Sequence, residues 1–70
     1  MTKKVDIYRP DIVGSTKIVS VCMNNEGNKW TSKHIKRTEI NELDYLICEG
    51  KRYEIKYIKF DGECMIVTNG

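Results

Sequence analysis

The sequence contains no long hydrophobic run. Hydrophobic residues make up 40% of the 70 residues and charged residues 31%, and the apolar residues come only a few at a time. A membrane-spanning helix needs about 20 successive apolar residues, and a secretory signal needs an apolar stretch behind its basic start. Neither follows the N-terminal "MTKK". We therefore expect one small domain over residues 1–70, in the cytoplasm and without a membrane partner.

The three cysteines are not spaced as a disulfide framework would require. Cys22, Cys48 and Cys64 are odd in number and form no CxxC pair. This favours free thiols in a reducing compartment, each behaving as a small hydrophobe. The alternative is a zinc site that uses all three cysteines and His34, but structural zinc sites usually draw their ligands in close pairs. We expect no metal and no cofactor.

Residue patterns that carry catalysis are also missing. The five glycines are isolated, so that none belongs to a GxGxxG or GKS/T phosphate loop. The only histidine, His34, has no serine or cysteine beside it in the sequence that could act as a nucleophile. Glu39, Glu42 and Asp44 cluster, but without the spacing of an oxygen-rich metal loop. The sequence favours a protein that is not an enzyme.

Charge is present, and it is unevenly distributed. Residues 1–37 hold eight basic and three acidic side chains, a balance of +5, whereas residues 38–70 hold four basic and seven acidic ones, a balance of −3. Two interpretations stay open. The two patches can face each other across one molecule, or the basic segment can form a surface for nucleic acid or an acidic partner.

Strand-forming sequence dominates the first half of the chain. Residues 4–9 alternate, with Val5 and Ile7 on one face, and Pro10 is expected to end this strand because it cannot donate to a ladder. Residues 16–23 predict a second strand and residues 29–36 a third. A loop over residues 25–28 would place Met23 opposite Trp30.

The second half predicts one turn of helix and a closing hairpin. Thr38 can cap a helical turn near residues 38–44, after which a strand resumes. The fold class is then all-β: a small, partly open barrel, SH3-like or OB-like, of five to six short antiparallel strands. The alternative is an α+β domain in which a helix within residues 31–45 packs on an antiparallel sheet.

The stretch "KRYEIKYIKFDGECMIVT", residues 51–68, predicts a hairpin with a two-residue loop at Asp61 and Gly62. That loop pairs Phe60 with Glu63 and Ile55 with Thr68, and it leaves apolar side chains on both faces. Either a bulge near Tyr57 or Ile58 merges the two faces, or one face meets a partner. One face carries Tyr53, Ile55, Tyr57, Cys64 and Ile66, and the other carries Ile58, Phe60, Met65 and Val67.

Two hypotheses for function follow. The leading one is a non-enzymatic binding module that acts through protein contact or self-association, and the alternative is a nucleic-acid-binding module that uses the basic segment 29–37. Trp30 is the aromatic platform in the alternative, unless it plugs the end of the barrel. The partner-binding residues of the leading hypothesis are Tyr57, Ile58, Phe60 and Met65, rimmed by Lys56 and Lys59. Those of the alternative are Lys29, Trp30, Lys33, His34, Lys36 and Arg37.

The segment "LICEGKRYEIKYIKFDGE", residues 46–63, resembles the closing strands of small SH3-like barrels, in which a G-K-x-Y-x-I turn and strand is common. It is also similar to the C-terminal part of tailed-phage head–tail connector proteins. The likeness covers about a quarter of the chain, and the connector function is not transferred. The small size, the Lys/Asn/Ile-rich composition and the lack of catalytic motifs suit an accessory or inhibitor protein of a phage or mobile element.

Overall fold

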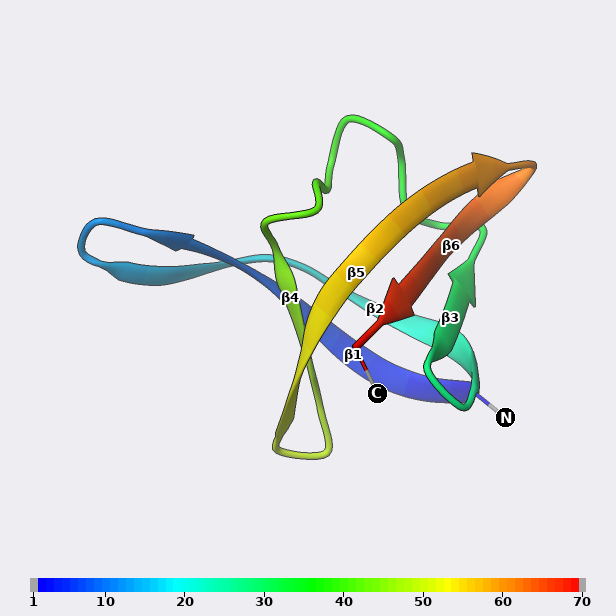
Figure 1. Cartoon of the computed structure of the whole chain (residues 1–70), viewed down its shortest axis with the longest axis horizontal. Helices are drawn as coiled ribbons and strands as arrows, with labels where there is room; N and C mark the ends of the chain where they lie inside the picture. Colours follow the sequence, from blue (N-terminus) through cyan, green and yellow to red (C-terminus); the bar gives the residue numbers. More distant parts are fainter. Residues whose placement is uncertain (1, 70) are drawn as a thin grey trace.

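The computed structural model describes residues 2–69. This part of the chain contains six antiparallel strands (Figure 1). No helix occurs in residues 2–69, so none of sufficient length and apolar character spans a membrane. The α+β alternative is therefore wrong. The strands are β1 (Thr2–Asp11), β2 (Gly14–Glu26), β3 (Lys29–Ser32), β4 (Tyr45–Cys48), β5 (Lys51–Asp61) and β6 (Glu63–Thr68).

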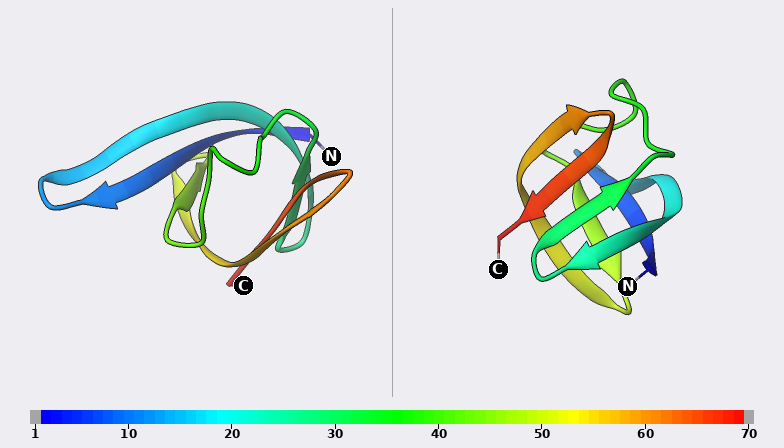
Figure 2. Two further views of the ribbon diagram at one scale, coloured as in Figure 1. Left: turned by 90° about the horizontal axis from the view of Figure 1, so that it is seen from above. Right: turned by 90° about the vertical axis from the view of Figure 1, so that its right-hand side faces the viewer.

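The strands close into a barrel in the order β1-β2-β3-β6-β5-β4. Two three-stranded meanders, β1 to β3 and β4 to β6, are joined by the long connection over residues 33–44 (Figures 1 and 2). Antiparallel pairing of β3 with β6 and of β4 with β1 joins the two meanders on both sides. The predicted small antiparallel barrel is confirmed, and it is closed instead of partly open.

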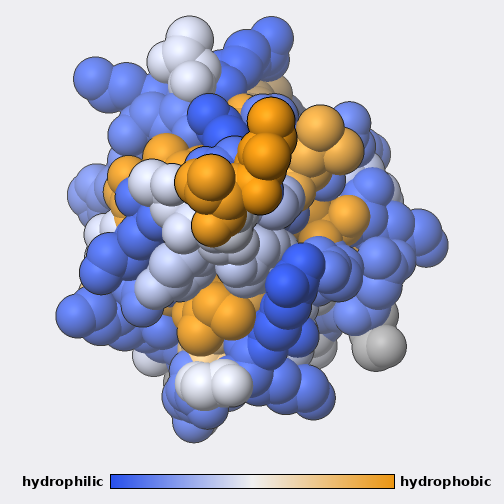
Figure 3. Space-filling view, turned by 90° about the vertical axis from the view of Figure 1, so that its left-hand side faces the viewer, coloured by the Kyte–Doolittle hydropathy of each residue, from blue (hydrophilic) through white to orange (hydrophobic). Residues whose placement is uncertain are grey.

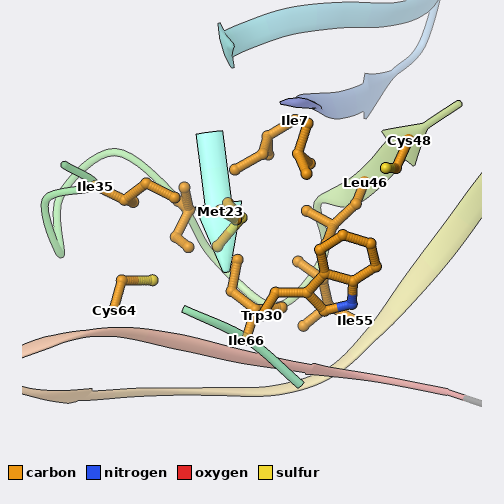
Figure 4. Close-up of a cluster of buried hydrophobic side chains, with 11 residues drawn as sticks. Ile7, Met23, Trp30, Ile35, Leu46, Cys48, Ile55, Cys64 and Ile66 are labelled. Atoms are coloured by element: carbon orange, nitrogen blue, oxygen red, sulfur yellow. The ribbon is translucent and has the colours of Figure 1, made fainter. Parts of the chain in front are cut away.

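The core fills the barrel with side chains from all six strands (Figure 4). Val5, Ile7, Met23, Leu46 and Ile66 have no exposed surface. The predicted alternation of β1 is confirmed, because Val5 and Ile7 point inward and their neighbours do not.

Trp30 is part of this core and is only 1% exposed. Its indole Nε1 donates a hydrogen bond to the Thr68 hydroxyl at 3.2 Å, and the ring meets Tyr53 edge-on at 5.1 Å. A buried tryptophan needs a partner for its N–H, and Thr68, itself fully buried, provides it. Trp30 therefore acts as a structural plug of the barrel.

A bulge in β5 brings apolar side chains from both predicted faces of the last hairpin onto one core. Gly62, at a φ of 77°, alone separates the paired residues Asp61 and Glu63, so the predicted two-residue loop is wrong and the pairing shifts by one residue. The register then shifts again between Ile55 and Tyr57, which restores the predicted pair of Ile55 with Thr68. As a result, four side chains of β5 pack on one core: Tyr53, Ile55, Ile58 and Phe60.

Two other local predictions are corrected by the structure. The β2–β3 turn is at Gly27 and Asn28, so Trp30 pairs with Asn25 and not with Met23. β3 ends at Ser32 instead of residue 36. The Ser32 hydroxyl accepts a hydrogen bond from the His34 backbone N–H at 3.0 Å, which turns the chain out of the strand.

The connection over residues 33–44 contains two β-turns where one helical turn was expected. The Glu39 N–H donates to the Lys36 carbonyl at 2.9 Å, and the Asp44 N–H donates to the Asn41 carbonyl at 3.1 Å. Neither turn continues into the next, because Ile40, between them, is buried against the core. The helical turn near residues 38–44 is wrong.

A buried carboxylate anchors this connection. The Asp44 side chain is fully buried and accepts hydrogen bonds from Arg9 Nε at 2.9 Å, from Arg9 Nη2 at 3.1 Å and from the Asn41 N–H at 2.9 Å. Its hydrogen bond and charge raise the pKa of Arg9 above its ordinary value. Asp44 thus fastens residues 33–44 to β1, 35 positions earlier in the sequence.

We expect Asp44→Ala to destabilise the barrel by about 2–4 kcal/mol, a loss of roughly 10–20 °C in Tm, because it removes three hydrogen bonds to a buried charge. Thermal unfolding followed by circular dichroism measures this change. Glu54→Ala is the control, because Glu54 pairs with Arg52 on the exposed surface and such pairs contribute about 0–1 kcal/mol. Equal, small shifts in both variants would contradict the anchoring role of Asp44.

Candidate interaction site

The β1/β2 hairpin projects from the barrel as a two-stranded arm (Figures 1 and 2). We call residues 9–17 the arm. All nine residues are exposed, and the pairs Arg9–Thr16, Pro10–Ser15 and Asp11–Gly14 extend the ladder to the turn. Pro10 was expected to end the strand, and the structure shows that it does not. Within the arm, residues 9–11 of β1 pair only with β2, because β4 pairs with residues 6–8. No other described strand therefore needs the N–H that Pro10 lacks.

The turn at the tip of the arm is built around Asp11. Its carboxylate accepts hydrogen bonds from the Val13 N–H at 2.9 Å and from the Thr16 hydroxyl at 3.4 Å. Asp at the first position and Gly at the fourth are typical of a type I turn, and Gly14 has a φ of 138°. Ile12 and Val13 therefore occupy the two central positions.

Ile12 and Val13 are the most exposed apolar side chains that the structure describes, at 103% and 94%. Figure 3 looks at the side toward which the arm extends, and hydrophobic atoms gather at the front of this view among hydrophilic ones. Gly, Asn, Asp and Ser dominate turns for conformational reasons, so the turn itself does not call for two β-branched aliphatic residues. The tip therefore presents apolar surface that the fold does not use.

Beside the arm, β2 has a free edge. One edge of β2 pairs with β1, and the other edge pairs with β3 only at Asn24, Asn25 and Glu26. Along residues 14–23, no strand within residues 2–69 pairs with this second edge. Residues 14–23 contain no proline and one charge, Lys17. Natural proteins usually protect edges with charges, prolines or bulges, and this edge has one charge, Lys17, and a register shift at Ile18, which has no partner in β1. An edge without a partner strand is a place where another strand can pair.

The structure divides the predicted partner-binding residues between two faces. Ile58 and Phe60 pack against the core, whereas Tyr57 and Met65 are half-buried and lie outside the core cluster. The ammonium of Lys59 lies 5.4 Å from the centre of the Tyr57 ring. Lys56 and Lys59 are exposed. The six residues therefore do not form one patch.

The predicted nucleic-acid residues are also divided. Trp30 is buried and cannot stack on a base, and the exposed Lys29 begins β3. The Arg37 guanidinium lies 5.4 Å from the centre of the Phe60 ring. The remaining side chains form an exposed basic group without the aromatic platform: Lys33, His34, Lys36 and Arg37, all in residues 33–44.

Sequence reasoning missed the tip of the arm, although the segment "PDIVGS" carried the signal. Two adjacent β-branched aliphatic residues between Asp11 and Gly14 do not match the polar composition of a surface turn. Leu43, at 81% exposed in residues 33–44, is the third large apolar side chain exposed in the described part of the chain.

The three cysteines differ in their environments. Cys22 is exposed on β2, whereas Cys48 and Cys64 are buried in the core. Burial raises the pKa of the Cys64 thiol to about 11 and that of Cys48 in the same direction. Among residues 2–69, no three Cys, His, Asp or Glu side chains are grouped so that they could hold a metal ion.

We expect only Cys22 to react with a thiol reagent at pH 9 in the native protein, and all three cysteines to react after unfolding in guanidinium. The pKa of the Cys64 thiol is higher in the folded protein than its ordinary value of 9.0, so the thiol loses its proton at a lower pH in the unfolded chain. The free energy of unfolding therefore falls as the pH rises from 9 toward 11. The reaction is followed by absorbance, with Cys22→Ser as the control. A fast-reacting thiol in that variant would contradict the assignment.

Comparison with known proteins adds no further information on this site. No protein-family model, curated protein or solved structure matches the chain.

Proposed function

We propose that this protein is a non-enzymatic binding module that holds another protein through its arm. The observation that carries the proposal is the full exposure of Ile12 and Val13 at a turn that projects from a closed barrel. A role as an accessory or inhibitor protein of a phage or mobile element is a finer proposal that rests on the small size, the composition and the lack of catalytic motifs.

The energetics support an interaction that uses more than the tip. Burying an aliphatic side chain contributes about 1.5–3 kcal/mol, so Ile12 and Val13 together contribute roughly 3–6 kcal/mol. Association costs about 4–15 kcal/mol in lost translational and rotational freedom. The tip therefore anchors a contact but needs support, and the free edge of β2 beside it offers backbone hydrogen bonds.

Site-specific photo-crosslinking tests this function. We expect a benzophenone side chain at position 12 to give a discrete protein adduct, resistant to nuclease, in cells that naturally contain the protein. The same probe at Thr38, exposed in residues 33–44, is the matched control and should give at least about tenfold less adduct, because a contact worth 1.4 kcal/mol is a tenfold effect. Equal adducts at the two positions, or none at position 12, would overturn the proposal.

A polar tip supplies the second half of this test. With the probe at Ser15, Ile12→Ser combined with Val13→Ser should reduce the adduct about tenfold. The same double variant should keep its Tm within a few degrees, because exposed substitutions change stability by about 0.5 kcal/mol or less. A large drop in Tm would show that the tip supports the fold, which contradicts a role reserved for binding.

Nucleic-acid binding is a second candidate function, favoured by the exposed cations Lys33, Lys36 and Arg37, with Lys29 nearby in sequence. If these four contact phosphates of a single strand, a fourfold rise in salt weakens binding by roughly 50-fold. Titration of a labelled oligonucleotide at two salt concentrations measures this, with Lys36→Glu as the sensitive variant and Lys4→Glu, on β1, as the control. Absence of binding at the lower salt concentration rejects this candidate.

A further inference from the structure

We infer that a hollow at one end of the barrel binds a nucleotide by its base and its phosphate. The hollow lies where the β2–β3 turn and the start of β5 meet the end of β6, at the lower end of the barrel in Figure 1. Its volume of about 470 Å³ is within the range of roughly 300–1,000 Å³ that small-molecule sites have. We call it the Tyr53 hollow, and its lining residues are Gly27, Asn28, Lys51, Arg52, Tyr53, Thr68 and Asn69.

The charge of the Tyr53 hollow favours an anionic ligand. Two other hollows in the described part of the chain each contain two lysines, but each also contains two acids. The Tyr53 hollow has Lys51 and Arg52 and no acid in its lining. Arg52 is already paired with Glu54 at 2.8 Å, whereas no acid within residues 2–69 forms an ion pair with Lys51. The Lys51 ammonium can therefore form charge-assisted hydrogen bonds with an anion.

Tyr53 gives this hollow an aromatic wall, which the other two hollows lack. The ring is half-buried and meets Trp30 edge-on at 5.1 Å. The Lys51 ammonium lies 5.3 Å from the centre of the Tyr53 ring, so that aromatic surface and positive charge are neighbours. A flat ring that carries an anionic group matches this arrangement, because the ring can stack on Tyr53 while the anion binds Lys51.

Two side-chain amides favour a nucleobase as the flat ring. The Asn28 Nδ2 donates to the Thr68 carbonyl at 3.0 Å, which leaves the Asn28 side-chain oxygen as an acceptor. Asn69 is exposed and is held by its backbone N–H, which donates to the Glu54 carbonyl at 2.9 Å, so its side-chain amide is left for a ligand. Amides supply both donors and acceptors, which the edge of a base also presents. A nucleotide combines such a ring with an anion.

The walls of the hollow are held in place without a ligand. The N–H and the hydroxyl of Thr68 donate to the Asn28 carbonyl at 2.9 and 3.2 Å, which joins the end of β6 to the β2–β3 turn. Lys51 follows a two-residue turn whose residues Glu49 and Gly50 have φ values of 53° and 78°, as in a type I′ turn. Binding therefore requires little reordering of the backbone, which lowers its entropic cost.

NMR titration of the full chain with each of the four ribonucleoside monophosphates tests the inference. We expect at least one of them to shift the Trp30 indole N–H and the amides of residues 51–53 and 68–69, with saturation below about 10 mM. The matching nucleoside and inorganic phosphate should each bind at least about tenfold more weakly, because each makes only part of the contact. No saturable shift with any of the four, or inorganic phosphate that binds as tightly as the nucleotide, overturns the inference.

Lys51→Met separates the Tyr53 hollow from the remaining surface. The variant keeps an unbranched side chain beside Tyr53 and removes the charge, so the dissociation constant should rise at least about tenfold. Lys56→Met removes the same charge elsewhere on β5 and is the matched control, because both lysines are exposed. Equal affinity in the two variants, or shifts confined to residues 33–37, would show that the nucleotide binds elsewhere and would overturn the inference.

Tyr53→Leu tests the stacking contact. Without the aromatic wall, the nucleotide should bind no more tightly than inorganic phosphate does, and a variant that keeps the affinity of the wild type contradicts the role of the ring. Tyr53 also packs against the core, so circular dichroism must first show that the variant folds. If it does not fold, the comparison of Lys51→Met with Lys56→Met decides alone.

A free nucleotide and the end of a single strand present the same base and phosphate. A trinucleotide with a 5′-phosphate distinguishes these two sources. Tighter binding of the trinucleotide than of the monophosphate assigns the hollow to a strand end, and binding of the monophosphate at least as tight assigns it to a free nucleotide. The hollow contains no residue of the arm, so crosslinking at position 12 and nucleotide binding succeed or fail separately.

Discussion

The contact between Arg9 and Asp44 fixes the relation between the arm and the barrel. Arg9 is the first residue of the arm, and Asp44 immediately precedes β4, which pairs with β1 at residues 6–8. A buried carboxylate is costly unless its hydrogen bonds are satisfied, and here Arg9 and the Asn41 N–H satisfy it. The arm can leave the barrel at a defined point because its base is fastened to the connection over residues 33–44.

The bulge in β5 solves the problem of a small core. A straight β5 would alternate its apolar side chains between two faces, and 70 residues cannot cover both. The register shift between Ile55 and Tyr57 lets Ile55 and Ile58 reach the same interior, while Tyr57 turns outward beside Lys59. Bulges also increase strand bending, which a closed barrel of short strands requires. The same feature therefore supplies the curvature and the single core.

The sequence predicted those features of the fold that depend on residues close together along the chain. The alternation of Val5 and Ile7 and the choice between a bulge and an open face could be read from the chain. The loop of the last hairpin could not, because Asp-Gly suits more than one turn length, and the helical turn near Thr38 failed because Ile40 is drawn into the core. The partner of Asp44 lies 35 residues away, so no local pattern indicates it. The exposed tip was visible as Ile12 and Val13 in a turn, but its projection from the barrel was not.

The two edges of the arm differ in a way that bears on function. On the β1 edge, Arg9 is held by Asp44, Pro10 has no N–H to donate and Asp11 uses its carboxylate within the turn. Proline and charge on an edge discourage pairing with another chain. The β2 edge has neither a proline nor an acid between Gly14 and Met23. The two edges of the arm are therefore unequally protected against pairing with another strand, and the less protected edge is that of β2.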